Sequence, residues 1–231
     1  MSIRSQEILK ELRLAPLWRH RIEDTVSSIV KTPSSSVTKI EDRKFQILHS
    51  DWAQLKEKVV GCTSCSLSQN RVKAVFGIGD KNADWLFVGD EPSVEENIQG
   101  KPFIGPSGEL LDNMLEAVSL KRDNNIYIAN IVKCRPPSNR NLDHSEALQC
   151  EPFLIRQIEL IRPKLIIALG EIAAQNLLGT NSTIDSLRGR LHEYSGIPLI
   201  VTYHPAYLLR IQSDKEKVWE DLCFARNIMK K

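Results

Sequence analysis

Short apolar runs alternate with longer helical patterns along most of this chain of 231 residues. The runs are rich in Ile, Leu and Val, whereas the segments between them repeat apolar residues with the period of a helix. Strands are expected over 85–88, 126–132, 165–169 and 199–202, and helices over 51–59, 107–119, 143–161, 171–178 and 214–229. Such alternation is typical of βαβ units and predicts a parallel sheet with helices on both faces.

The first 44 residues differ in pattern from the rest of the chain. Residues 1–24 predict an amphipathic helix, and residues 27–42, rich in Ser, Thr and Pro, predict a flexible linker. We therefore expect an N-terminal helix and linker over 1–44 and one folded domain over 45–231.

Charge and hydropathy limit the class of protein. The chain has no run of eighteen apolar residues and no signal-peptide pattern, so we expect a cytoplasmic protein without membrane contact. A net charge of +2 is much smaller than that of a protein that coats nucleic acid, so any contact with DNA must be confined to a local basic group. Two basic groups are candidates for that contact: Lys133, Arg135 and Arg140, and Arg188, Arg190 and Arg210.

Four of the five cysteines have the spacing of a metal site. Cys62 and Cys65 are close enough in sequence to bind one metal centre, and Cys134 and Cys150 complete a four-thiolate shell if folding brings them alongside. An odd number of cysteines in an intracellular protein also favours metal ligation or free thiols over disulfides. Because four thiolates suit zinc as well, a structural zinc protein is one alternative.

Polar residues follow the expected strands. Asp90 and Glu91 come after the first run, and adjacent carboxylates on a tight turn can orient a water or stabilise a cation. Asn130 lies in the second run and offers a donor and an acceptor together, whereas His204 follows the fourth run. Ligands bind outside the carboxyl ends of parallel strands, so these residues are expected at one site.

A Gly- and Pro-rich segment, GKPFIGPSG, follows the acidic turn and opens a helix at Ser107. Backbone N–H groups at such a helix start suit a phosphate or another anion.

Taken together, the two cysteine pairs, GDEPS, GKPFIGPSG, NIVKCRPPSNR and HPAYLLR resemble the iron–sulfur uracil-DNA glycosylases, family 4 of that superfamily. The resemblance covers residues 55–230 in the right order and spacing. It implies an α/β fold: three-layer α/β/α with a short, mainly parallel four-stranded central sheet. It also implies a DNA-repair enzyme that flips uracil out of DNA, hydrolyses its N-glycosidic bond and leaves an abasic site. The implied cofactor is a [4Fe-4S] cluster, with Cys62, Cys65, Cys134 and Cys150 as its ligands.

The resemblance also implies roles for single residues. Phe103 is similar to the aromatic residue that stacks on the flipped uracil, Asn130 to the residue that binds its edge, and His204 to the donor for the oxygen that gains charge. The partner is uracil-containing DNA, bound by a monomer associated with the nucleoid. Leu208, with Leu209, is expected as a wedge in the vacated base stack. The expected DNA-binding residues are Ser107, Arg135, Arg140, Leu208 and Arg210.

The acidic turn departs from the family pattern, which usually reads Gly-Glu-(Ala or Gly)-Pro-Gly. Here Asp90 replaces the Glu, Glu91 takes the small-residue position and Ser93 replaces the last Gly. Iron-free family 1 enzymes, with Gly-Gln-Asp-Pro-Tyr, place their catalytic acid at the position of Glu91. Our hypothesis is that Asp90, Glu91 and His204 are catalytic and that Glu91 shares or takes over the activation of water. The alternative is a catalytically weakened iron–sulfur DNA-binding module of the same fold.

Overall fold

The structure is a computed structural model that describes residues 35–137, 140 and 142–230. The helix expected over 1–24 lies outside the described residues. Residues 40–231 form one compact unit.

A six-stranded sheet with the strand order β1-β3-β2-β4-β6-β5 forms the centre of this unit. Its four inner strands are parallel: β3 (Ile126–Asn130), β2 (Trp85–Gly89), β4 (Leu165–Leu169) and β6 (Ile197–Thr202). All five residues of β2, β3 and β4 are buried, as expected of strands covered on both faces.

Two antiparallel edge strands, β1 (Ile78–Gly79) and β5 (Leu191–Tyr194), complete the sheet. The expected number of four strands is therefore wrong, although the four expected strands are all present. The edge strands were missed because β1 has only two residues, and β5 alternates exposed with half-buried residues instead of forming an apolar run.

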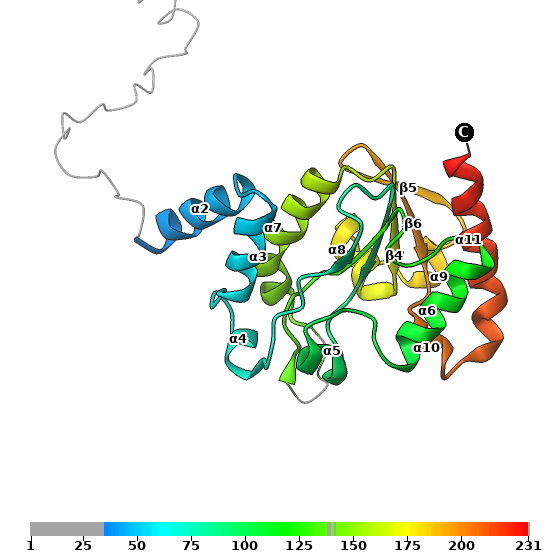
Figure 1. Ribbon diagram of the computed structural model, residues 1–231, viewed down its shortest axis with the longest axis horizontal. Helices are drawn as coiled ribbons and strands as arrows, with labels where there is room; N and C mark the ends of the chain where they lie inside the picture. The colour runs from blue at the N-terminus through cyan, green and yellow to red at the C-terminus, as the bar shows by residue number, and fades with distance from the viewer. Residues whose placement is uncertain (1–34, 138–139, 141, 231) are drawn as a thin grey trace, which may run out of the picture. The chain divides into compact units, whose positions relative to one another are not determined.

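Helices cover both faces of the sheet, so the α/β/α layering is confirmed (Figure 1). One face packs against α3 (Trp52–Val60), α7 (His144–Ile161) and α8 (Glu171–Leu178), and the other against α6 (Pro106–Ala117) and α11 (Lys215–Met229). Strand side chains alternate between the two cores; for example, Leu86 and Val88 face the first, and Trp85 and Phe87 the second.

The remaining elements are short, apart from the first helix. They are α2 (Ser35–Leu48), α4 (Leu67–Asn70), α5 (Val94–Gln99), α9 (Ile184–Leu187), α10 (Pro205–Leu208) and the 3-10 helix η2 (Gln212–Asp214). Within the described part of the chain, none of the helices combines the length and apolar character needed to cross a membrane.

Helix α2 corrects the expected linker over residues 27–42. The helix starts at Ser35, so the second half of that stretch is helical. Near the end of α2, Ile47 is buried in the same core as α3 and α7. The Ser-, Thr- and Pro-rich composition hid this helix because its anchoring contact lies after the polar stretch.

Candidate active site

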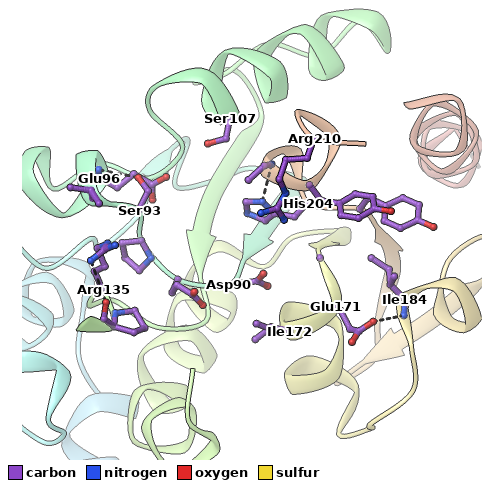
Figure 2. A pocket seen from close by; sticks show the side chains of 18 of the residues that line it. Asp90, Ser93, Glu96, Ser107, Arg135, Glu171, Ile172, Ile184, His204 and Arg210 are labelled. Carbon is purple, nitrogen blue, oxygen red and sulfur yellow. Dashed lines mark hydrogen bonds between the residues drawn. The ribbon is translucent and has the colours of Figure 1, made fainter. Parts of the chain in front are cut away.

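The carboxyl ends of the inner strands open on a cleft of about 890 Å³. Asp90 and Glu91 line it directly after β2, Glu171 after β4 and His204 after β6. Figure 2 shows Asp90 and His204 in the middle of this cleft, with Arg210 next to His204 and Glu96 and Arg135 on the opposite side.

Asp90 is tied to the start of α8. Its Oδ1 accepts a hydrogen bond from the Ala173 N–H at 2.7 Å. Burial and the nearby charge of Glu91 raise the pKa of Asp90 to about 8, against the smaller opposing effect of that hydrogen bond. At neutral pH most Asp90 side chains therefore carry a proton.

Glu91 has a different environment. Burial raises the pKa of its carboxyl, whereas the charges of Arg135 and Arg140 lower it. Its Oε2 is buried and has no hydrogen-bond partner among the described residues. The two adjacent acids are thus unlike: Asp90 is fixed and protonated, and Glu91 has an unpaired oxygen within the influence of two cations.

His204 is held in one tautomer. The residue caps α10, and its Nδ1 accepts a hydrogen bond from the Ala206 N–H at 3.1 Å. Burial, with a smaller contribution from Arg210, lowers the pKa of His204 to about 4, so the ring is neutral at physiological pH. A neutral ring that accepts at Nδ1 carries its proton on Nε2, and this N–H is a donor.

Phe103 lies next to His204, with ring centroids 5.3 Å apart. Its backbone is left-handed, with φ 50°, an uncommon conformation for an aromatic residue. Arg122 holds this conformation, because it donates to the Phe103 carbonyl at 3.0 Å and is itself held by Asp112 at 2.7 Å. Arg122 was missed in the sequence, where no motif links it to the segment that it fixes.

Gly89, the last residue of β2, lets Phe103 and Asn130 come together. A Cβ atom at this position would lie 2.7 Å from both Asn130 Oδ1 and Phe103 Cζ, closer than packing permits. Gly89 also pairs with Asn130 across β2 and β3, so the register of the sheet places the amide beside the ring.

The Asn130 side chain is buried, and neither its Oδ1 nor its Nδ2 makes a hydrogen bond of normal geometry among the described residues, although the amide is close enough to the Glu96 carboxyl to lower its pKa. Leaving a buried polar group unpaired costs about 1–3 kcal/mol, so both atoms of this amide are expected to receive partners from a ligand.

Glu96 is a further site residue, to which the sequence analysis gave no role. It lines the cleft from α5, where Ser93 Oγ accepts its backbone N–H at 3.3 Å, and burial raises the pKa of its carboxyl to about 7. Its Oε2 also has no partner among the described residues. The Ser93-x-x-Glu96 spacing, typical of a capping box, was the available signal for this short helix.

Four of the five expected DNA-binding residues line the cleft, and Leu208 does not. Ser107, in the first turn of α6, lines the cleft together with Arg135, Arg140 and Arg210. Arg140 forms two hydrogen bonds with Glu146, at 2.9 and 2.6 Å.

Two residues that were expected to contact DNA are buried in this structure. Leu208 is 0% exposed and packs in the core with α6 and α11, whereas Leu209 is 43% exposed. Lys133 is 1% exposed, and its Nζ donates to the Asn130 carbonyl at 2.9 Å and to Gln157 Oε1 at 2.7 Å. In this arrangement both side chains pack inside the protein and away from the surface.

The two cysteine pairs meet away from the cleft. Cys62, Cys65, Cys134 and Cys150 line one small cavity together with Val59, Leu67 and Phe153, and all four thiols are free. Folding has therefore brought the second pair alongside the first.

Similarity to known proteins shows to which family the chain belongs. The profile of the uracil DNA glycosylase superfamily matches residues 76–223. The chain belongs to the uracil-DNA glycosylase superfamily. Three similar proteins are named type-4 uracil-DNA glycosylases, which confirms the resemblance to family 4.

The type-4 relatives cover most of the chain. The protein from Thermotoga maritima is 39% identical over 181 residues, 77% of this chain and 94% of its own. The one from Archaeoglobus fulgidus is 36% identical over 181 residues, 72% of this chain and 90% of its own. The one from Sulfurisphaera tokodaii is 41% identical over 165 residues, 68% of this chain and 74% of its own.

The four thiols suit the iron–sulfur cluster implied by this glycosylase family. Arg71 donates to Cys134 Sγ at 3.0 Å and the Lys133 backbone N–H to Cys150 Sγ at 3.3 Å, as expected around electron-rich sulfurs. No group of three or more Cys, His, Asp or Glu in the described residues is placed to hold a single metal ion.

Proposed function

We propose that this protein removes uracil from DNA by hydrolysing the N-glycosidic bond, which leaves an abasic site. The observation that carries the proposal is the buried Asn130 amide, which lies beside the Phe103 ring and makes no hydrogen bond of normal geometry among the described residues, although it is close enough to the Glu96 carboxyl to lower the pKa of that group. Uracil presents a complementary amide-like edge and a flat ring. The base must leave the duplex to reach these residues, at a cost of roughly a few kcal/mol.

His204 supplies the electrostatic part of the reaction. Breaking the bond leaves negative charge on the base and a cation-like sugar, so a donor aimed at a uracil oxygen stabilises the transition state more than the ground state. Since His204 is neutral and its Nδ1 accepts from Ala206, its proton is on Nε2, and this N–H is the donor for the uracil oxygen.

Glu91 takes the proton from the attacking water. This assignment follows from the difference between the two acids: Asp90 is protonated and bound by Ala173, whereas Glu91 has a free oxygen and two nearby arginines. Asp90 then orients the turn through its hydrogen bond to α8. A general base must be free of its own proton before it can accept one from water.

A [4Fe-4S] cluster on Cys62, Cys65, Cys134 and Cys150 is the proposed cofactor. These cysteines come from the segment after α3, the loop after β3 and α7, so a cluster bound by them would hold these three parts of the fold together. A brown protein with an absorbance band at about 400 nm supports this cofactor, and a colourless protein with stoichiometric zinc contradicts it.

The DNA backbone lies along Ser107, Arg135 and Arg210, with Arg140 at the margin of the cleft. The N–H groups at the start of α6 and the arginine side chains bind phosphates without reading sequence. We further expect a monomer that acts in the cytoplasm at the nucleoid; size-exclusion chromatography and cell fractionation test these two expectations.

The proposed activity is tested with the cluster-loaded protein and an oligonucleotide that contains one uracil. Alkali cleavage at the uracil position, absent from a matched oligonucleotide with thymine, is the expected result. Binding without cleavage would favour a second candidate, the catalytically weakened DNA-binding module. The observation in favour of that candidate is the replacement of the usual small residue by Glu91 in the cleft.

A further inference from the structure

Three basic residues from separate parts of the chain donate hydrogen bonds to the cysteines, Arg71 and Arg43 through their guanidinium groups and Lys133 through its backbone N–H. Arg71 lies after α4, Lys133 after β3, and Arg43 on α2. Arg71 and Lys133 contact Cys134 and Cys150, as described above, whereas Arg43 Nη2 donates to Cys62 Sγ at 3.4 Å. Arg43 is the contact that the family's motifs do not include, since it lies before residues 55–230, over which the chain resembles the family.

Arg43 makes three kinds of contact at once. Besides the bond to Cys62, both of its terminal nitrogens donate to the Gln149 carbonyl at 3.2 Å. Its guanidinium carbon also lies 5.3 Å from the centroid of the Phe153 ring. Gln149 precedes the ligand Cys150, so one guanidinium links the first cysteine pair to α7.

The position of Arg43 matters because the two ends of the cysteine cavity differ in exposure. Cys134 and Cys150 are buried, whereas Cys62 and Cys65 are half-buried. Water, oxidants and chelators therefore reach a cluster from the side of Cys62 and Cys65, and Arg43 lies at Cys62. An iron–sulfur cluster with four thiolates carries net negative charge, and hydrogen bonds to its sulfurs stabilise it in surroundings that are otherwise apolar.

We propose that Arg43 is a positioning residue of the cluster site and that α2 shields the exposed side of the cluster. This inference rests on the proposed cofactor. The guanidinium holds the Cys62 thiolate against α7 and covers the Cys62 end of the cysteine cavity. The part of α2 that carries Arg43 is thus part of the cofactor site, although it lies before residues 55–230, over which the chain resembles the family.

The test compares Arg43→Met with Lys44→Met in the full-length, cluster-loaded protein. Both substitutions remove one positive charge from α2, but Lys44 is exposed and Met at position 43 still packs against Phe153. Loss of the band at about 400 nm is followed in air with an iron(II) chelator. We expect loss roughly tenfold faster in Arg43→Met, the usual size of an effect on a hydrogen bond to a metal ligand. Lys44→Met should match the wild type.

A second readout separates a contact with the cluster from general support of the fold. Removal of a hydrogen bond to Cys62 Sγ should shift the Fe–S stretching bands in the resonance Raman spectrum of Arg43→Met, and Arg43→Lys should restore part of the shift. If Arg43→Met does not fold, Arg43→Lys and Arg43→Gln provide the same comparison. Unchanged bands, equal rates of loss in Arg43→Met and wild type, or equal acceleration in Lys44→Met would each overturn the inference.

Iron analysis of the wild-type protein keeps the two proposals distinct. A wild type that contains no iron after anaerobic purification contradicts the cofactor itself. A wild type with a full cluster whose stability does not depend on Arg43 contradicts the role of Arg43 alone.

Discussion

The carboxyl of Asp90 accepts a hydrogen bond from the Ala173 N–H at 2.7 Å, which ties the turn after β2 to the first turn of α8. The same carboxyl has its pKa raised to about 8, mainly by burial. Position and protonation are therefore coupled: the bond fixes the side chain in a place where its charged form is unfavourable.

Asp90→Asn should stabilise the protein increasingly as the pH rises. The folded-state pKa of about 8 lies above the reference value of 3.8, so between these values the folded form keeps a proton that the unfolded form loses, and rising pH favours unfolding. Asparagine removes this slope and still accepts from Ala173. The pH-dependent part of the gain should be on the order of 5 kcal/mol at pH 8 and about 2 kcal/mol at pH 5. Thermal unfolding of both proteins at the two pH values measures it, and a gain independent of pH would contradict the assigned protonation.

Glu91→Gln should slow single-turnover release of uracil by roughly 100-fold, the usual contribution of a general base. Asp90→Asn should cost less, since Asp90 is protonated at neutral pH and serves by orienting the turn. Equal, near wild-type rates in both variants would refute a role for either acid.

The dependence of this rate on pH identifies the base independently of mutation. A base must lose its proton, so the rate rises with pH through its pKa. If Asp90 were the base, the midpoint of the rise would lie at about 8. Burial raises the pKa of Glu91 against the opposing charges of Arg135 and Arg140, whereas a neighbouring carboxylate raises the pKa of Asp90 further, so a Glu91 base predicts a midpoint at lower pH than an Asp90 base. Single-turnover rates between pH 5 and pH 9 distinguish the two acids.

The strands that could be predicted from the sequence are those whose environment is uniform. Residues of β2 and β4 are buried on both faces, and this produces the continuous apolar runs that predict a parallel sheet. In β5, by contrast, Leu191 and Glu193 are both exposed, so apolar and charged residues share one face and no pattern results.

The roles of single site residues could be predicted only for residues that belong to a recognisable sequence motif. The charge of Lys133 suggested surface, because the partner that permits its burial, Gln157, lies 24 residues further along the chain. Arg122 supports Phe103 from 19 residues away and belongs to no motif. Contacts of this kind depend on tertiary packing, which the local sequence does not record.

Gly89→Ala should slow uracil release by roughly 100-fold while leaving the protein folded, because misplacement of binding groups by about 1 Å has an effect of this size. The new methyl group would lie 2.7 Å from Asn130 Oδ1 and Phe103 Cζ, so one of these side chains must move. Gly179→Ala is the matched control: it costs stability through its φ of 60°, but no atom lies within 4 Å of its Cβ position. Uracil release should be normal in the control, and a normal rate in Gly89→Ala would contradict the proposed base pocket.

Leu209→Ala should reduce excision from double-stranded DNA by about tenfold and leave excision from single-stranded DNA nearly unchanged. Leu209 is 43% exposed and directly precedes Arg210 at the cleft, which places it where a wedge would enter the base stack. Only a duplex requires the wedge, because the flipped base leaves a gap between its stacked neighbours. Rates on matched single- and double-stranded substrates measure the ratio.

Leu208→Ala provides the contrast, since Leu208 is 0% exposed. Its truncation should lower the free energy of unfolding by about 2–5 kcal/mol, as expected for a buried leucine. Activity of the fraction that remains folded should fall equally on both substrates. A loss specific to duplex DNA in Leu208→Ala, with none in Leu209→Ala, would mean that α10 rearranges on DNA and that the buried leucine is the wedge.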